Sequence, residues 1–342
     1  MRILILGGGV FLGVHTLRAA LGRGHTVSVF NRGRACSAWP DGVEVLTGDR
    51  STGDVASLAR RRVDAVIDTC GYGPDEVRRS AAALRAADCY LFVSSISAYA
   101  TAPPGGVPIR ESNALLSAAG IARDDRTPSH YGAQKAACEA EVERAFGRRA
   151  LIVRPGLIVG PGDPTGRFSH WPWRSAEGGR MLVPDVPPGA PIQCIDVRDL
   201  AGWMIGLVER GARGAFNGTG PCGGAVSGWR GLLQACRDAA TAHGFEAAQA
   251  VPVSEAFLLE HAVEPWRELP LWLPSGDPQL AGLYRIDTAR AEATGLRTRP
   301  LPETVAAVLG EGLPAADDPR RAGKLTRERE AALLAAWAAR AR

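Results

Sequence analysis

The sequence predicts an α/β fold in which a doubly wound parallel sheet carries a smaller C-terminal lobe. In the first half of the 342 residues, short apolar runs alternate with helical patterns, which is typical of βαβ units. The runs are nearly continuous, as expected for strands that helices cover on both faces. From about Arg154 onward Pro and Gly become frequent and the alternation stops. We therefore expect one domain over residues 1–155 and a lobe over most of 156–342, with 192–217 returning to the first domain.

Each element follows from its own pattern. Strands are expected at 2–6, 26–30, 43–46, 65–68, 90–93 and 150–153, and helices between them at 11–23, 54–62, 74–86 and 130–146. Residues 160–164 and 184–191 are rich in Pro and Gly and predict loops. Thr326 begins an amphipathic pattern that runs to Trp337, which predicts a terminal helix with a threonine cap.

The charge and the cysteine pattern of the chain argue against several classes of protein. The net charge of +4 comes from scattered arginines, which favours neither nucleic acid nor an anionic membrane as a partner. The cysteines are odd in number, dispersed and without C-x-x-C spacing, so we expect free thiols in a reducing cytoplasm and no metal site. They are Cys36, Cys70, Cys89, Cys138, Cys194, Cys222 and Cys236. The first apolar run is too short for a signal peptide, and no segment reaches membrane-spanning length.

Lys135 is one of only two lysines in a chain with thirty-eight arginines, and it follows Tyr131 by four residues. On a helix this spacing places both side chains on one face, one turn apart. The ammonium there favours the phenolate and lowers the tyrosine pKa from its usual value of about 10. The pair therefore predicts a tyrosine that acts as an acid or base near neutral pH.

A glycine-rich turn follows the first predicted strand. Glycines at this point permit a tight strand-to-helix turn and let the helix N-terminus meet a pyrophosphate. Val10 stands where the G-x-x-G-x-x-G form has its central glycine, so the match is imperfect. The turn predicts a dinucleotide site that includes Gly7, Gly9, Val10, Phe11, Leu12 and Gly13.

The end of the second strand bears on the choice between NAD and NADP. An acidic residue there would bind the ribose 2′-hydroxyl of NAD. Asn31 takes that place with Arg32 beside it, which slightly favours NADP, although Arg32 also fits a solvated turn. Asp49, after the third strand, is placed either to accept from the adenine amino group or to cap a helix. Arg50 follows it and is counted with the cofactor residues.

A pair of serines follows the strand at 90–93. Ser94 and Ser95 lie where open α/β sheets bind ligands, so a hydroxyl there can reach a substrate oxygen. With these motifs the chain resembles the extended short-chain dehydrogenase/reductases, in particular their NAD(P)-dependent epimerase/dehydratase branch, and hence a Rossmann fold. The resemblance covers residue 1 to about 220 and rests on the glycine turn, 48–50, 94–95, 131–135, 154–156, 160–162, 196–201 and 216–217.

The resemblance implies roles for individual residues. Tyr131 would be the acid/base, Lys135 would hold the nicotinamide ribose, and Ser95 would orient the reacting oxygen with Ser97 as a neighbour. Further cofactor contacts would come from Cys70, Gly71, Ser94, Pro155 and Gly156. The C-terminal lobe offers His170, Trp171 and Gln193 as substrate contacts, and Tyr72 is counted with them, although burial in the lobe core is the better explanation for most of the tryptophans. The sugar 4,6-dehydratases carry Thr-Asp-Glu after the serine strand, and this chain lacks that run. Substitutes for its acid and base would be Glu111, Asp124, Asp125 and His130, although His130 also fits a solvent-facing helix start.

Three functions remain open on the sequence alone. The first is an NAD(P)-dependent epimerase or dehydratase that transiently oxidises a hydroxyl of a sugar, nucleotide sugar or nucleoside. The second is an NADPH-dependent ketone reductase, which needs the same serine, tyrosine and lysine. The third is a non-catalytic relative that binds a nucleotide or RNA, which the low net charge and the retained Ser95, Tyr131 and Lys135 disfavour. The family resemblance also raises the expectation of a homodimer, as in many relatives.

Overall fold

A computed structural model describes residues 1–34, 39–59, 61–100, 106–187, 189–221, 228–275 and 282–340, so Cys36 and Cys222 lie outside the described residues. The chain divides into two compact units. Unit 1 consists of Met1–Ile158, Ile195–Gly220 and Ile286–Thr298, and unit 2 of Val159–Cys194, Pro221–Arg285 and Arg299–Arg342. The chain thus enters unit 1 three times, and the last of these segments was not expected from the sequence.

Unit 1 contains a seven-stranded parallel sheet in the order β10-β6-β5-β4-β1-β2-β3. Its strands are β1 (Arg2–Leu6), β2 (Thr26–Asn31), β3 (Glu44–Thr47), β4 (Ala65–Asp68), β5 (Cys89–Val93), β6 (Ala150–Pro155) and β10 (Gly214–Gly218). The strand order changes direction between β1 and β4, which is the arrangement of the Rossmann fold. The predicted α/β class with a doubly wound parallel sheet is confirmed.

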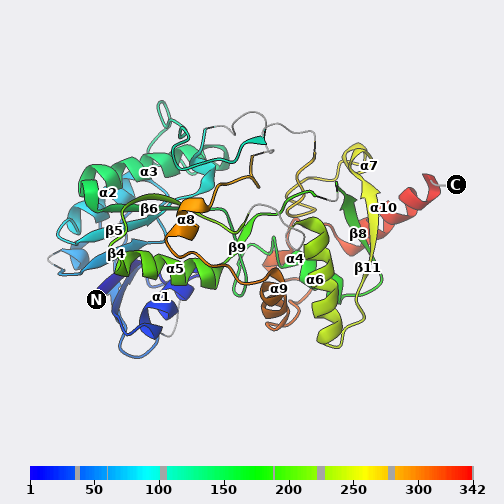
Figure 1. Ribbon diagram of the computed structural model, residues 1–342, viewed down its shortest axis with the longest axis horizontal. Helices are drawn as coiled ribbons and strands as arrows, with labels where there is room; N and C mark the ends of the chain where they lie inside the picture. Colours follow the sequence, from blue (N-terminus) through cyan, green and yellow to red (C-terminus); the bar gives the residue numbers. More distant parts are fainter. Residues whose placement is uncertain are drawn as a thin grey trace. The chain divides into compact units, whose positions relative to one another are not determined.

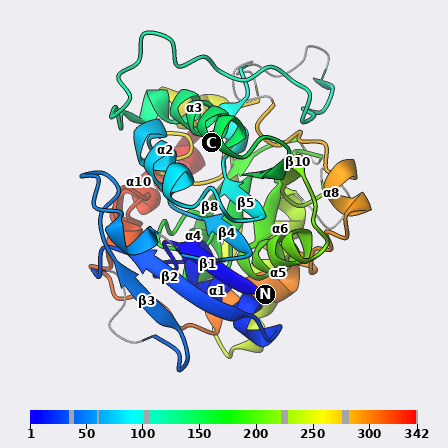
Figure 2. The ribbon, with the colours of Figure 1, turned by 90° about the vertical axis from the view of Figure 1, so that its left-hand side faces the viewer.

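Helices cover both faces of this sheet (Figures 1 and 2). Helices α1 (Leu12–Gly22) and α5 (Val197–Glu209) pack on one face, and α2 (Pro74–Ala83) and α3 (Tyr131–Phe146) pack on the other. Successive strand residues point to opposite faces, so Ile3 and Ile5 join the core under α5, whereas Leu4 and Leu6 join the core under α3. Unit 1 also contains the short helix α8 (Ala289–Ala293). A separate two-stranded sheet is formed by β7 (Leu157–Val159) and β9 (Cys194–Asp196), which lie where the chain passes from one unit to the other.

The predicted helix at 54–62 is wrong. The structure has only a 3-10 turn there, η1 (Ala56–Leu58), and Arg60 lies outside the described residues. Leu58 is completely buried and Val55 and Val63 pack at the edge of the same core, so a single turn is enough to bury the apolar side chains of this segment. The other predicted strands and helices of unit 1 differ from the observed ones by at most three residues at an end.

Unit 2 combines a short parallel sheet with helices. Its strands are β8 (Arg180–Asp185) and β11 (Gln249–Ser254), and its helices are α4 (His170–Ala176), α6 (Trp229–Ala242), α7 (Glu255–Glu260), α9 (Leu301–Leu309) and α10 (Arg327–Arg340). The loop predicted at 184–191 begins later than expected, because β8 continues to Asp185. Thr326 Oγ1 accepts the backbone N–H of Arg329 at 3.2 Å, so the predicted cap starts the last helix. None of the helices in the described ranges has the length and apolar character needed to cross a membrane.

Candidate active site

The carboxyl ends of the parallel strands in unit 1 gather the polar and glycine-rich segments of the sequence at one edge of the sheet. Gly7 follows β1, Gly71 follows β4, and Ser94 and Ser95 follow β5, while Asn31 ends β2. Open α/β sheets bind their ligands at this edge, next to the point where the strand order reverses. Here that point lies between β1 and β4.

The turn after β1 requires glycine at three positions. Gly7 and Gly8 have φ of 106° and 84°, and a Cβ on Gly8 would lie 2.9 Å from a methyl of Val29. A Cβ on Gly13 would lie 2.7 Å from the backbone nitrogen of Gly8, so the first turn of α1 packs directly on the loop. The sequence pointed to Gly9 instead of Gly8, and Gly9 does not have a positive φ. Such a close turn leaves backbone N–H groups at the start of a helix facing an approaching anion.

Val10, Phe11 and Leu12 form the middle of this turn. Val10 is 54% exposed, so its side chain lies outside the turn where the usual central glycine would be. Phe11 precedes α1 with φ of 37°, and its ring packs at the edge of the core that contains Leu12. The substitution of valine for glycine is therefore compatible with the close contact between Gly8 and Gly13.

The end of β2 offers an amide and exposed cations, with no carboxylate. Asn31 Oδ1 accepts the backbone N–H of Gly33 at 2.7 Å, and Asn31 Nδ2 is buried without a hydrogen-bond partner among the described residues. Arg32 is exposed. Asp49 Oδ1 accepts the N–H and the hydroxyl of Ser51, and these bonds lower the pKa of Asp49, helped by Arg32. Asp49 thus stabilises a turn and caps no helix.

The side chain of Arg50, which was expected to contact the cofactor, binds the carboxylate of Asp68 inside unit 1. Its guanidinium makes two hydrogen bonds to Asp68, at 2.6 and 2.9 Å, and further bonds to Ser80 Oγ and Cys70 Sγ. The residue is only 6% exposed. Its side chain is therefore part of the interior of unit 1, and a contact between Arg50 and the cofactor stays a prediction.

Lys135 lies at the centre of the site. Its Nζ donates to the carbonyls of Gly71 and Val93, both at 2.8 Å, and the residue is 3% exposed. The ring centroids of Tyr72 and Phe92 are each 5.0 Å from Nζ, and that of Tyr131 is 5.9 Å away. Burial lowers the pKa of Lys135, an effect that the neighbouring phenol of Tyr72 opposes. Two of the three ammonium protons are used, which leaves one for a further acceptor.

Tyr131, Ser95 and Ser97 are brought together by the start of α3. A Cβ on Gly132 would lie 2.0 Å from the carbonyl oxygen of Ser97, so α3 packs on the backbone of the 3-10 turn η2 (Ile96–Ala98). Ser95 caps that turn by accepting the N–H of Ser97 at 3.1 Å. Tyr131 remains 38% exposed, whereas Ser95 is 8% exposed and Ser97 is exposed. Tyr131 is therefore an accessible phenol near a buried ammonium, on a helix that packs on the turn carrying the two serines.

Two further hydroxyls border the edge of the sheet without partners. Ser94 Oγ and Thr219 Oγ1 are buried and have no hydrogen-bond partner among the described residues. A Cβ on Gly156 would lie 2.5 Å from Thr219 Oγ1, so the segment Pro155–Gly156 at the end of β6 packs closely on the end of β10. These hydroxyls are available to a polar ligand.

Two of the three acids suggested as substitutes for the missing dehydratase residues, Glu111 and Asp125, have structural partners. Glu111 Oε1 accepts the N–H of Asn217 at 2.9 Å. Asp125 accepts the N–H of Thr127 and pairs with His130 Nδ1 at 2.9 Å, and its pKa falls to about 2 through these bonds. A carboxyl with so low a pKa stays ionised near neutral pH and is a poor proton donor. Asp124 is exposed.

The remaining predicted substrate residues belong to unit 2, whereas Tyr131 and Lys135 belong to unit 1. Trp171 is completely buried and donates its indole N–H to the Pro270 carbonyl at 2.9 Å, so it is a core residue of unit 2. Burial lowers the pKa of His170 to about 3, which keeps the imidazole neutral. Gln193 is 2% exposed.

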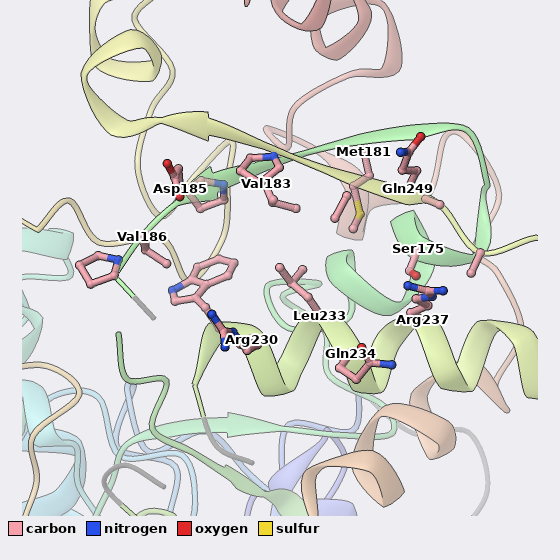
Figure 3. Close-up of a pocket in the computed structure, with 17 residues that line it drawn as sticks. Ser175, Met181, Val183, Asp185, Val186, Arg230, Leu233, Gln234, Arg237 and Gln249 are labelled. Atoms are coloured by element: carbon pink, nitrogen blue, oxygen red, sulfur yellow. The ribbon is translucent and has the colours of Figure 1, made fainter. Parts of the chain in front are cut away.

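Unit 2 contains a pocket of about 680 Å³ between α6 and the strands β8 and β11 (Figure 3). One face of α6 lines it, with Arg230, Leu233, Gln234 and Arg237 at helical spacing, and Met181 and Val183 come from β8. Ser175 Oγ lines the pocket, is buried and has no partner among the described residues. Neither guanidinium forms an ion pair within the described part of the chain. Asp185 also lines the pocket, so its charged side chains are two guanidiniums and one carboxylate. The volume suits a small-molecule ligand, and the excess of positive charge favours an anionic one.

Comparison with models of known protein families identifies the family of this chain. The family model described as "NAD dependent epimerase/dehydratase family" matches residues 3–217, which include the glycine turn, Ser95, Tyr131 and Lys135. The chain belongs to this family. The resemblance predicted from the sequence is confirmed. In this epimerase/dehydratase family member the match ends just before Gly218, and the C-terminal part of the chain lies beyond it.

Solved structures show the same fold over most of this family member. The Bordetella bronchiseptica enzyme WbmH, in complex with NAD+, is 16% identical with a TM-score of 0.62 and covers 90% of this chain and 97% of its own. The UDP-glucose 4-epimerase of Thermus thermophilus, in complex with NAD, is 19% identical with a TM-score of 0.60 and coverages of 91% and 99%. Human epimerase family protein SDR39U1, with NADPH, is 17% identical with a TM-score of 0.56 and coverages of 92% and 100%. No curated protein sequence matches significantly.

The residues of this family member fit a dinucleotide at the edge of the sheet. Gly7, Gly8 and Gly13 permit the tight strand-to-helix turn, because any Cβ there would collide with neighbouring protein atoms, and such a turn presents the N–H groups of a helix start to a pyrophosphate. The unpartnered Asn31 amide at one end and the unpartnered Ser94 hydroxyl at the other offer donors to a polar ligand. Among the described residues, no group of three His, Cys, Asp or Glu side chains is arranged to hold a metal ion.

Proposed function

We propose that this protein is a NAD(P)-dependent enzyme that transiently oxidises a hydroxyl of a sugar or nucleoside and then epimerises the neighbouring carbon or eliminates water. The main observation behind this proposal is the set of groups around the Lys135 ammonium. A buried ammonium with one proton left for an acceptor lies beside an accessible phenol at the ligand-binding edge of the sheet.

A nicotinamide dinucleotide, when bound, supplies the hydride acceptor for the oxidation. Tyr131 removes the proton of the substrate hydroxyl, and Ser95 donates a hydrogen bond to the same oxygen. The Lys135 ammonium stabilises the phenolate and donates its remaining N–H to the cofactor ribose. The carbonyl formed on the substrate makes the adjacent C–H acidic, which permits inversion or loss of a β-hydroxyl before the hydride returns.

We propose NADP rather than NAD as the preferred cofactor. Asn31 stands where a carboxylate would bind the 2′-hydroxyl of NAD, so nothing at the end of β2 repels a 2′-phosphate. Arg32 is exposed beside it and is close enough to Asp49 to lower the pKa of that carboxyl. A cation in this position favours a dianionic phosphate.

We propose a nucleotide-linked sugar as the substrate class, on the chemistry of the pocket in unit 2. Arg230 and Arg237 are two helical turns apart, about 10 Å, and both are exposed and unpaired within the described chain. Apolar side chains of Leu233, Met181 and Val183 line the space between them. A ligand that carries phosphate groups on an apolar or aromatic part would match two separated cations with apolar side chains between them. UDP-glucose 4-epimerase is among the similar structures, which is consistent with such a substrate.

The test is turnover of a panel of nucleotide sugars with NADP or NAD, followed by NMR of the product sugar. Tyr131→Phe is expected to abolish turnover and to leave cofactor affinity nearly unchanged, because only the acid/base is removed. If the variant keeps near-normal activity, the mechanism is wrong. Stoichiometric oxidation of NADPH by a ketone without return of the hydride would identify a reductase instead.

Lys135→Arg is the sharper variant, since it keeps the charge and changes the shape. A guanidinium carries five N–H groups, and the described surroundings offer two carbonyl acceptors, so we expect at least a hundredfold loss of kcat. The matched control is Lys324→Arg, because Lys324 makes a single 3.3 Å bond to the Thr165 carbonyl in unit 2 and should tolerate the change.

The expected homodimer and cytoplasmic location stay predictions.

A further inference from the structure

Strand β4 of unit 1 ends in a buried carboxylate that the proposed mechanism does not use. Asp68 is completely buried at the end of an otherwise apolar strand, and its partner Arg50 is 6% exposed. A buried ion pair pays a large desolvation penalty and is often no more stabilising than apolar residues of the same volume. The pair therefore calls for a role other than stability.

The pair is held by a complete set of hydrogen bonds. Arg50 donates to both carboxylate oxygens, at 2.6 and 2.9 Å, and Tyr90 donates its hydroxyl to Asp68 Oδ2 at 2.8 Å. Arg50 also donates to Ser80 Oγ at 3.2 Å. The carboxylate is thus fixed in position by donors from separate segments of unit 1.

From Asp68 the contacts lead directly to the active site. Asp68 Oδ1 accepts the backbone N–H of Cys70 at 3.1 Å, which shapes the loop after β4. Gly71 is confined in this loop, because a Cβ there would lie 2.5 Å from the Phe92 ring and 3.2 Å from Asp68 Oδ2. The carbonyl of Gly71 is one of the two acceptors of Lys135 Nζ.

Asp68 also acts on Lys135 through its charge. Burial lowers the pKa of Lys135, and the negative end of the ion pair opposes that effect. The titratable groups that face the ammonium are Tyr72 and Cys70 on the loop after β4, Tyr131 and Cys138 on α3, and Asp68 on β4. The pairing with Arg50 keeps the pKa of Asp68 low in spite of its burial, whereas burial raises the pKa of Cys70, Tyr72 and Cys138, so Asp68 remains ionised while these three groups are neutral.

We propose that Asp68 and Arg50 are positioning residues for Lys135, which fix the carbonyl that the ammonium binds and keep the ammonium charged. Neither side chain touches the substrate in this arrangement, so neither is a catalytic residue. The proposal rests on the proposed function for its kinetic consequences, and its electrostatic part can be measured without any substrate.

The direct test uses the presence of only two lysines in the chain. In protein labelled with ¹³C-lysine, the ε-carbon resonances of Lys135 and Lys324 are titrated by NMR and assigned with Lys324→Arg. Asp68→Asn keeps the size and one acceptor oxygen but removes the charge and leaves Arg50 unpaired. The titration midpoint of Lys135 should fall by about one pH unit, with that of Lys324 unchanged. An unchanged Lys135 midpoint in folded D68N overturns the electrostatic part.

Two variants separate this role from a loss of stability. Glu330→Gln breaks a second buried pair, between Arg174 and Glu330 in unit 2, and should lower the melting temperature without moving the Lys135 midpoint. Arg50→Lys keeps the charge and loses the two-pronged contact, so the Lys135 midpoint should stay in place while kcat falls about tenfold. The variant adds a third labelled lysine, whose resonance is identified as the one absent from the spectrum of the parent protein. A shifted midpoint or an unchanged kcat in R50K contradicts the proposal, and this variant remains informative if D68N does not fold.

The kinetic test is the pH profile with the substrate found in the panel. D68N should move the alkaline limb of kcat to lower pH by the same amount as the NMR midpoint, because Lys135 then loses its proton earlier. A Lys135 midpoint that shifts in a protein without epimerase or dehydratase activity would refute the proposed function and leave the link between Asp68 and Lys135 standing.

Discussion

Gly132→Ala tests whether the contact between α3 and the serine turn creates the active site. The Cβ would lie 2.0 Å from the carbonyl oxygen of Ser97, and real Cβ atoms do not approach closer than 3.0 Å. The two backbones must therefore separate by about 1 Å, which moves Tyr131 relative to Ser95. Forced separation of packed groups costs about 3 kcal/mol at the upper end of measured overpacking.

Two measurements follow from this magnitude. A cost of about 3 kcal/mol should lower the melting temperature by about 6–12 °C for a domain of this size. A misplacement of about 1 Å between reacting groups should reduce kcat on the order of 100-fold. Cofactor affinity should change little, because the glycine turn after β1 is not involved. The assays are thermal unfolding by circular dichroism and turnover of the nucleotide sugar found in the panel.

Gly202→Ala is the matched control. Gly202 lies within α5 of the same unit, and a Cβ there would have no atom within 4 Å. Alanine is the better helix former by about 0.5–1 kcal/mol, so G202A should be slightly more stable and fully active. If G132A behaves like G202A, the packing of α3 on Ser97 does not position the site and the reasoning fails.

Two further predictions concern ligand binding. Arg32→Ala should weaken NADPH binding about tenfold in a fluorescence titration and change NADH binding less than twofold, because only NADPH carries the 2′-phosphate; equal losses for both cofactors would exclude this role for Arg32. Replacing Arg230 and Arg237 together by Gln should raise KM for a nucleotide sugar about tenfold or more with kcat retained, because both guanidinium charges are lost from a pocket that contains neither Tyr131 nor Lys135; a fall in kcat at constant KM would argue against a binding role.

The strands of unit 1 could be predicted because their signal is local. Residues 3–6 and 65–67 are apolar runs bounded by a charged residue or glycine, and the ends of β1 and β4 lie within one residue of these runs. The helix expected at 54–62 failed because its apolar spacing also fits a single turn that buries Leu58. The spacing of apolar residues over nine positions cannot distinguish a helix from a single turn, because the apolar area that the neighbouring sheet leaves to be buried determines which of them forms.

Long-range contacts account for what the sequence did not reveal. The segment Ile286–Thr298 returns to unit 1, and Asn217 bonds the carbonyls of Ile109 and Asp287, which are 108 and 70 residues away. The sequence grouped Arg50 with the cofactor residues through the motif at 48–50 and did not reveal its partner Asp68, which is 18 residues further along the chain. Asp68 did carry a signal, because an acid at the end of an apolar strand needs a buried partner.

The presence of a lysine at position 135 in so arginine-rich a chain follows from the same contacts. Lys135 is enclosed by two carbonyls and the rings of Tyr72 and Phe92, and the adjacent carboxylate of Asp68 is already occupied by Arg50. An arginine at position 135 would bring five donors to a place with two acceptors, and each buried donor left unpaired costs about 1–3 kcal/mol. Arginine serves well at position 50, where a carboxylate accepts two parallel bonds. The two cations are thus not interchangeable, and each stands where its own donor geometry is satisfied.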